Sequence, residues 1–238
     1  MEQGGLSVQQ GPLPVAEDQL QPPPFSFPVL HRQRVIDVLD RAARHRVTLV
    51  CGPAGSGKTV ACATWAAAQP GDRKVAWLTL HADEDRAWFW ADIWAALTRA
   101  GAVRPEAAES LADVSADDFP LRLAEVARVF GVPAVLVIDN AHVITNGAVL
   151  AGLDSLIRHA PPTWRLFLSG RQPPGLQLAR LKASGGLATV GAAALACTPA
   201  EADAYLALPG REFNSRPDRA WTGPPTPAPA WVPPGSQQ

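Results

Sequence analysis

The chain has 238 residues, 47% hydrophobic and 18% charged, with a formal net charge of −1. This suits one globular domain with its own core and argues against strong electrostatic attraction to nucleic acid. Three cysteines without a C-x-x-C pair argue against a disulfide framework or a zinc site. The sequence has no apolar run of ~20 residues and no signal-peptide pattern, which predicts a cytoplasmic protein with no membrane contact.

Proline is concentrated at the two ends of the chain. Residues 1–28 and 209–238 lack helix or strand periodicity and are predicted to be disordered or extended. The folded domain is therefore expected to cover residues 29–208.

The first predicted elements are a helix over residues 30–46 and a buried strand over 47–51. The basic residues of this helix are interpreted as a solvated face, with contact to a nucleotide as the alternative; they are Arg32, Arg34, Arg41, Arg44 and Arg46. The strand runs into a glycine-rich turn, and a helix over 57–69 follows it.

The turn fills the pattern G-x-x-x-x-G-K-[ST] with Gly52, Gly57, Lys58 and Thr59. Glycines let backbone N–H groups approach phosphate oxygens, and the next helix directs its positive N-terminal end at the same anion. Lys58 is expected to contact the β- and γ-phosphates, and the Thr59 hydroxyl is a hard oxygen ligand for Mg²⁺. An ordinary glycine-rich turn is the alternative to a nucleotide phosphate site, whose predicted members are Gly52, Pro53, Ala54, Gly55, Ser56, Gly57, Lys58, Thr59 and Val60.

A strand over 74–80, an aromatic-rich helix over 86–100 and a helix over 119–130 precede an apolar strand over 134–139. Asp139 stands at the carboxyl end of this strand, where ligands of open α/β sheets bind. It is predicted to hold Mg²⁺ together with Thr59, usually through water. An acid that caps a strand-to-loop turn is the alternative.

The rest of the chain predicts helices over 148–158 and 175–183, strands over 164–169 and 187–191, and a helix over 199–208 that Thr198 caps. Arg171 follows a strand and would lie on the same rim as Lys58 and Asp139. It is a candidate sensor of the γ-phosphate, or else a surface arginine. The alternation of strands and helices predicts a P-loop NTPase fold, a three-layer α/β/α arrangement with about five parallel strands.

These stretches resemble the ATPase domain of MalT-like regulators, the large ATP-binding LuxR-type transcription regulators of the STAND class of P-loop NTPases. The resemblance covers residues 29–207, and its most specific part is Leu-Ser-Gly-Arg-Gln-Pro-Pro at 168–174 with Leu-Ala-Arg-Leu at 178–181. It implies a nucleotide switch that binds ATP or ADP with Mg²⁺, with Lys58, Asp139 and Arg171 in the catalytic set. It also implies partners, either copies of the chain or the rest of a regulator.

Two features depart from the family pattern. Asn140 stands where the family usually has a second acid, and an amide can orient a water but cannot accept its proton, so slow hydrolysis with binding retained is predicted. His142 matches a common family histidine. The resemblance ends near residue 207, so we expect a truncated member or a lone ATPase module that does not bind DNA by itself.

Two other functions stay open on the sequence. One is a self-contained P-loop enzyme, such as a small-molecule kinase or a nucleotide hydrolase, for which Arg180 and Lys182 are the only pair suited to a lid. The other is a non-catalytic remnant or interaction module. A GTPase is not expected, because no Asn-Lys-x-Asp motif occurs.

Overall fold

The computed structural model describes residues 17–81, 86–104, 107, 111, 114–130 and 132–208. The disorder predicted for 1–16 and 209–238 lies outside these residues.

Residues 17–28 were predicted to be disordered or extended, and the structure has one short helix among them. Glu17–Leu20 forms a short 3-10 helix (η1), and Leu20 and Phe25 pack against the core. Isolated apolar side chains among prolines are ordered here by tertiary contacts, which a search for periodicity does not detect.

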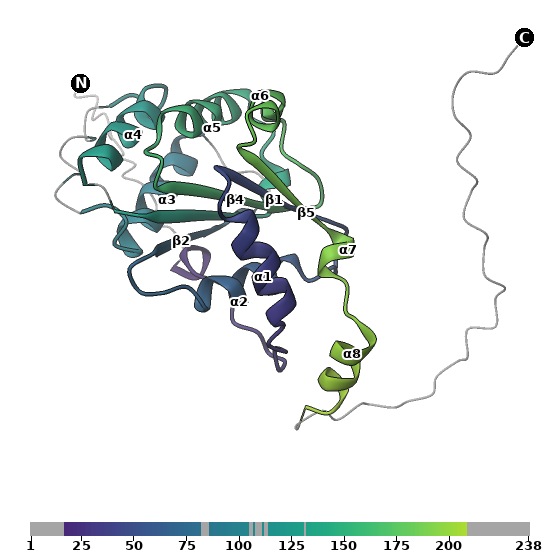
Figure 1. Ribbon diagram of the computed structural model, residues 1–238. Helices are drawn as coiled ribbons and strands as arrows, with labels where there is room; N and C mark the ends of the chain where they lie inside the picture. The colour runs from purple at the N-terminus through teal and green to yellow at the C-terminus, as the bar shows by residue number, and fades with distance from the viewer. Residues whose placement is uncertain are drawn as a thin grey trace, which may run out of the picture.

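One five-stranded parallel sheet organises the described part of the chain. Its strands are β1 (Val47–Cys51), β2 (Lys74–Thr79), β3 (Ala134–Asp139), β4 (Trp164–Gly170) and β5 (Leu187–Gly191). They lie in the order β2-β3-β4-β1-β5, and each neighbouring pair is parallel (Figure 1). The predicted α/β architecture with about five parallel strands is confirmed.

Helices cover both faces of the sheet. They are α1 (Gln33–Ala42), α2 (Lys58–Ala67), α3 (Arg86–Arg99), α4 (Phe119–Phe130), α5 (Gly147–His159), α6 (Leu178–Ala183), α7 (Ala192–Leu195) and α8 (Pro199–Leu206). Helices α1 and α2 lie on one face, and α4 and α5 lie on the other (Figure 1). Across the described ranges, none of the helices has the length and apolar character that a membrane span needs.

Side-chain alternation along the strands divides the core into two clusters. In β3, Leu136 and Ile138 join the cluster under α3, α4 and α5, whereas Val135 and Val137 join the cluster under α1 and α2. Because strand side chains alternate between faces, Asp139 at the end of β3 belongs to the face that α2 covers.

The strand order also fixes where the acid lies relative to the phosphate loop. Strand β4 separates β1 from β3, so the ends of β1 and β3 are two strand spacings apart, about 10 Å. Helix α2 begins just after β1 and contacts β4. This path carries the start of α2 across the sheet toward Asp139.

Candidate nucleotide-binding site

The loop between β1 and α2 needs glycine at several positions. Gly55 and Gly57 have φ values of +76° and +79°, a region that side-chain-bearing L-residues rarely adopt. At Gly52 a Cβ atom would lie only 2.9 Å from Ser56 Oγ and 3.1 Å from Ala192 Cβ. The loop is therefore tightly wound just before the N-terminal end of α2.

The Lys58 side chain lies inside this loop. Its Nζ donates hydrogen bonds of 2.9 Å to the carbonyl oxygens of Gly52 and Pro53, and it lies 3.4 Å from Ser56 Oγ. These acceptors are neutral, so they position the ammonium group without cancelling its charge. A phosphate oxygen can replace a carbonyl oxygen as a stronger, charged acceptor.

Thr59 and Asp139 meet directly across β4. The Thr59 hydroxyl donates a 2.8 Å hydrogen bond to Asp139 Oδ2. The carboxylate is almost fully buried, and its Oδ1 has no hydrogen-bond partner among the described residues. A hydroxyl beside a carboxylate with a spare oxygen is a donor set that suits Mg²⁺.

Asn140 has a backbone role that the sequence reading did not include. Its φ of 60° and ψ of 27° are left-handed, a conformation that asparagine tolerates better than most residues. Its Nδ2 donates a 3.3 Å hydrogen bond to the carbonyl of Leu80, the residue that follows β2. This hydrogen bond connects the turn after β3 to the chain after β2 and stabilises the turn.

His142 packs closely on β4, because a Cβ at Gly170 would be 3.1 Å from His142 Cβ. Burial lowers the pKa of His142, the positive charges of Arg171 and Lys58 lower it further, and the charge of Asp139 opposes them. The ring is therefore neutral at pH 7, with its buried Nδ1 unpartnered within the described chain.

Arg171 is exposed after β4, close enough to act on His142 electrostatically. It makes no hydrogen bond to another described residue. The structure thus brings together Lys58, Thr59 and Asp139. Arg171 lies at the exposed end of β4 and is not hydrogen-bonded to these three residues.

Cys51 and Cys62 lie beside this site but do not supply a reactive thiolate. Burial raises the pKa of both thiols, and the charge of Asp139 adds to the increase at the fully buried Cys62. Both cysteines therefore act as packing residues.

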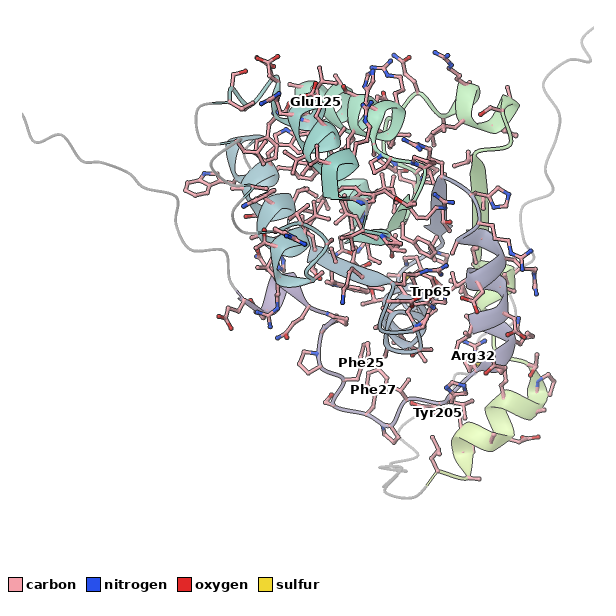
Figure 2. The ribbon with its side chains drawn as sticks, turned by 60° about the vertical axis from the view of Figure 1, so that its left-hand side comes forward. Phe25, Phe27, Arg32, Trp65, Glu125 and Tyr205 are labelled. Carbon is pink, nitrogen blue, oxygen red and sulfur yellow. The ribbon has the colours of Figure 1, made fainter. Side chains whose placement is uncertain are left out.

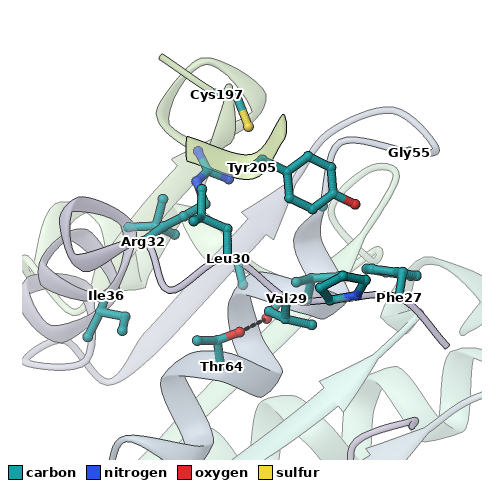
Figure 3. A pocket seen from close by; sticks show the side chains of 14 residues that line it. Phe27, Val29, Leu30, Arg32, Ile36, Gly55, Thr64, Cys197 and Tyr205 are labelled. Atoms are coloured by element: carbon teal, nitrogen blue, oxygen red, sulfur yellow. Dashed lines mark hydrogen bonds between the residues drawn. The ribbon is translucent and has the colours of Figure 1, made fainter. Parts of the chain in front are cut away.

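A cavity of about 270 Å³ opens beside the phosphate loop. Figure 3 shows its walls converging from the segment before α1, from α2 and from α8. The lining is mostly apolar, with Arg32 as the charged member: Phe27, Pro28, Val29, Leu30, Arg32, Val35, Ile36, Gly55, Gly57, Val60, Ala61, Thr64, Cys197 and Tyr205. The sequence pattern did not predict most of this cavity, although Phe27 and Val29 alternate through the proline-rich stretch and give a weak signal.

Helix α8 is attached to α1 by charged contacts rather than by apolar packing, since none of its residues is buried. Glu201 accepts hydrogen bonds from Arg32 at 3.0 Å and from Arg34 at 3.2 Å, and both arginines also donate to the Ala196 carbonyl. Figure 2 shows Arg32 and Tyr205 at this junction of α1 and α8. We call the Arg32–Arg34–Glu201 contact the clasp.

The clasp predicts an acid-sensitive attachment of α8. Hydrogen bonds from Arg34, from the Thr198 backbone N–H and from Arg32 lower the pKa of Glu201 from 4.5 to about 2. Because the folded-state pKa is depressed, the stabilisation is present above pH 4.5 and is lost as pH falls toward 2. Tyr205 is the only tyrosine of the chain, so the ¹⁹F NMR signal of a fluorotyrosine-labelled protein should report α8 detaching in that pH window.

The Glu201→Gln variant removes the charge but keeps a side chain that can close the capping box. Its fluorotyrosine signal should indicate partial detachment of α8 at pH 7 and should lose the transition between pH 4.5 and 2. The control is Glu125→Gln, which breaks an exposed ion pair with Arg122 on α4. An unchanged transition in Glu201→Gln would contradict the clasp.

Comparisons with known proteins found a matching family and similar curated proteins. The AAA ATPase domain family matches residues 30–169. Over 182 residues the chain is 33% identical to the HTH-type transcriptional regulator MalT of Yersinia pestis (strain Pestoides F), covering 74% of this chain and 20% of that protein. MalT of Klebsiella pneumoniae (strain 342) is 30% identical over 185 residues, with the same coverage. The chain thus spans about a fifth of the length of these relatives.

Two solved structures have a lower similarity. The Walker-type ATPase PABY2304 of Pyrococcus abyssi has a TM-score of 0.48 at 11% identity and covers 75% of this chain and 57% of its own. PCH-2 of C. elegans has a TM-score of 0.36 at 16% identity, and the match covers 67% of this chain and 41% of the PCH-2 chain. The fold assignment therefore rests on the strand order and the phosphate loop of the chain itself.

Proposed function

This chain belongs to the AAA ATPase domain family, and from that premise we propose that it is an ATP- and ADP-binding switch domain of the kind found in MalT-type regulators. The observation that carries the proposal is the junction of Lys58, Thr59 and Asp139. The loop that positions Lys58 begins α2, and α2 places the Thr59 hydroxyl 2.8 Å from the acid of β3. A phosphate chain bound at the loop would lie between these three groups.

We propose that Thr59 and Asp139 hold Mg²⁺. The unpartnered, buried Oδ1 of Asp139 supports this, because a buried carboxylate oxygen without a partner costs free energy that a cation or its water would remove. When held there by Thr59 and Asp139, Mg²⁺ would supply positive charge that offsets the negative charge of the phosphate groups. Lys58 would contact the same phosphates from inside the loop.

The cavity next to the loop is the proposed site of the nucleoside. Gly55 and Gly57 line its edge, so a ligand anchored by its phosphates at the loop can extend directly into it. Its apolar walls suit a planar base. Arg32 supplies a polar group, since its buried Nε has no hydrogen-bond partner in the described chain and can donate to a ring nitrogen.

Calorimetric titration of ATP, ADP and GTP into the full chain with Mg²⁺ tests the proposal, together with an assay of phosphate release. We expect saturable, micromolar binding of ATP and ADP with slow hydrolysis. The absence of saturable binding would favour a non-catalytic module. Rapid phosphoryl transfer to a small acceptor would favour a self-contained kinase.

We expect ATP hydrolysis to be slow because Asn140 stands where similar proteins usually have a second acid after Asp139. The Asn140→Asp variant should therefore hydrolyse ATP faster. A general base typically contributes 10²- to 10⁴-fold, and a partly aligned carboxylate here should give about 10- to 100-fold. Aspartate tolerates the left-handed conformation as asparagine does, and the substitution gives up the 3.3 Å hydrogen bond from Asn140 Nδ2 to the Leu80 carbonyl. The measurement is single-turnover release of phosphate from ATP.

The matched control is Asn146→Asp, which keeps a side-chain oxygen for the backbone N–H groups of Ala148 and Val149 at the start of α5. Its hydrolysis rate should equal that of the wild type. A rate unchanged in Asn140→Asp would show that the missing acid does not limit hydrolysis.

A further inference from the structure

A second concave site lies at the amino ends of the strands, whereas the phosphate loop follows the carboxyl end of β1. It is a pocket of about 580 Å³, and it has three arginines and one acid; its lining residues are Asp40, Ala43, Arg44, Arg73, Pro133, Ala134, Val135, Thr163 and Arg165. We call it the arginine pocket. The amino ends of β3 and β4 form its floor, and Ala134 is five residues before Asp139, a separation of about 16 Å along the strand.

Arg165 is rigidly held at this pocket without losing its charge. Its Nε donates to the Ala43 carbonyl at 3.2 Å, and its Nη1 donates to the carbonyls of Pro162 and Trp164. All three acceptors are neutral backbone groups. Both hydrogens of Nη2 have no partner among the described residues, so a preorganised donor pair remains.

Arg73 and Arg44 leave still more donors free. Arg73 donates one hydrogen bond of 2.9 Å, to the neutral Gln69 amide oxygen, and Arg44 makes no side-chain hydrogen bond within the described ranges. Both are exposed at the pocket. The Asp40 carboxylate offsets part of their charge, but its Oδ1 already accepts from Trp65 and Gln69.

Like charges are thus held near one another in this region. Burial lowers the pKa of Arg165, and the positive charge of Arg73 lowers it further; the charge of Arg165 acts in the same direction on Arg46. A bound anion would relieve this repulsion. Guanidinium groups bind phosphate oxygens in a bidentate manner, which favours a phosphate over a less directional anion.

We propose that the arginine pocket binds a small anion that carries phosphate groups, at a site separate from the nucleotide site. Its concave shape and its volume lie within the range of small-molecule pockets. A nucleic-acid surface would instead present a broad basic face, which the net charge of −1 does not favour.

The test uses inorganic pyrophosphate and the full chain carrying Lys58→Ala, so that binding at the phosphate loop is weakened. Calorimetry at low salt should give saturable binding with a submillimolar dissociation constant. The Arg44→Gln/Arg73→Gln double substitution, made at exposed positions, should weaken it about tenfold or more. The matched control is Arg128→Gln/Arg158→Gln, exposed arginines on α4 and α5, which should leave the affinity within about twofold.

Amide NMR of the wild-type chain gives a second measurement that does not depend on the Lys58 substitution. Pyrophosphate should shift the amide signals of Arg73, Ala134 and Arg165 separately from those of residues 52–60. Unchanged signals at the pocket, or equal affinity in the Arg44→Gln/Arg73→Gln chain, would overturn the proposal. Tighter binding of a single-stranded oligonucleotide through the same arginines would also overturn it, in favour of a nucleic-acid contact.

Discussion

Replacing Lys58 by alanine is expected to weaken ATP binding by about 10- to 100-fold, the range that a lost hydrogen bond to a charged group implies. In the nucleotide-free chain the ammonium group donates to two neutral carbonyls, those of Gly52 and Pro53. Phosphate oxygens are charged acceptors, so the lysine gains electrostatic energy when it exchanges one set for the other. Alanine removes this gain, and the measurement is a calorimetric titration with ATP and Mg²⁺.

The fold should survive this substitution, because the two carbonyls lie in a loop that water can reach and can be hydrated. Lys182→Ala, which removes an exposed lysine of α6, is the matched control and should bind ATP as the wild type does. AMP lacks the phosphates that Lys58 is proposed to contact, so its affinity should hardly differ between the Lys58 variant and the wild type. Equal ATP affinity in Lys58→Ala would contradict a nucleotide site at this loop.

The strands could be predicted because each buried strand corresponds to a short run of apolar residues in the sequence. The bounds of β1, β3 and β5 agree with the predicted 47–51, 134–139 and 187–191. Helix ends were less accurate: the helix predicted over 30–46 is Gln33–Ala42, and the one predicted over 175–183 begins at Leu178. Caps and tertiary contacts decide where helices end, and a periodic pattern continues past them.

The order of the strands could not be predicted from the pattern. Nothing in the periodicity of β4 indicates that it lies between β1 and β3, because a buried parallel strand is apolar whichever neighbours it has. The sequence therefore predicted Lys58, Thr59 and Asp139 as members of one site but not the route by which they meet. That route is α2 crossing β4, which brings the Thr59 hydroxyl to the acid.

The two pockets were missed for a related reason. Each is built from segments far apart in the chain, and the residues share no spacing that a motif could capture. The arginines of the first helix were interpreted as one solvated face, yet they have different roles: Arg32 and Arg34 hold Glu201, Arg46 donates to carbonyls at the end of α5, and Arg44 lines the arginine pocket. Only the packing of α1 against other elements separates these roles.

Replacing Trp65 by alanine should cause the largest loss of stability among these variants, about 3–5 kcal/mol. The Trp65 side chain is fully buried, and its ring stacks on Phe167 of β4 with centroids 4.4 Å apart and an interplanar angle of 14°. Its Nε1 donates a 2.8 Å hydrogen bond to Asp40 of α1. Since most domains unfold with only 5–15 kcal/mol, chemical denaturation should detect a large drop.

Trp65→Phe separates the two contributions of this side chain, because it keeps an aromatic ring for Phe167 but removes the donor to Asp40. It should cost about 1–2 kcal/mol, the value of a hydrogen bond to a charged group plus a small loss of volume. The control is Trp88→Ala, since Trp88 is only half-buried on α3 and should cost roughly 1 kcal/mol or less. Trp65 anchors α2 to β4 two turns after Thr59, so the alanine variant should also lose nucleotide affinity at temperatures where it is still folded. A stable Trp65→Ala chain with wild-type affinity would show that α2 is positioned by its N-terminal loop alone.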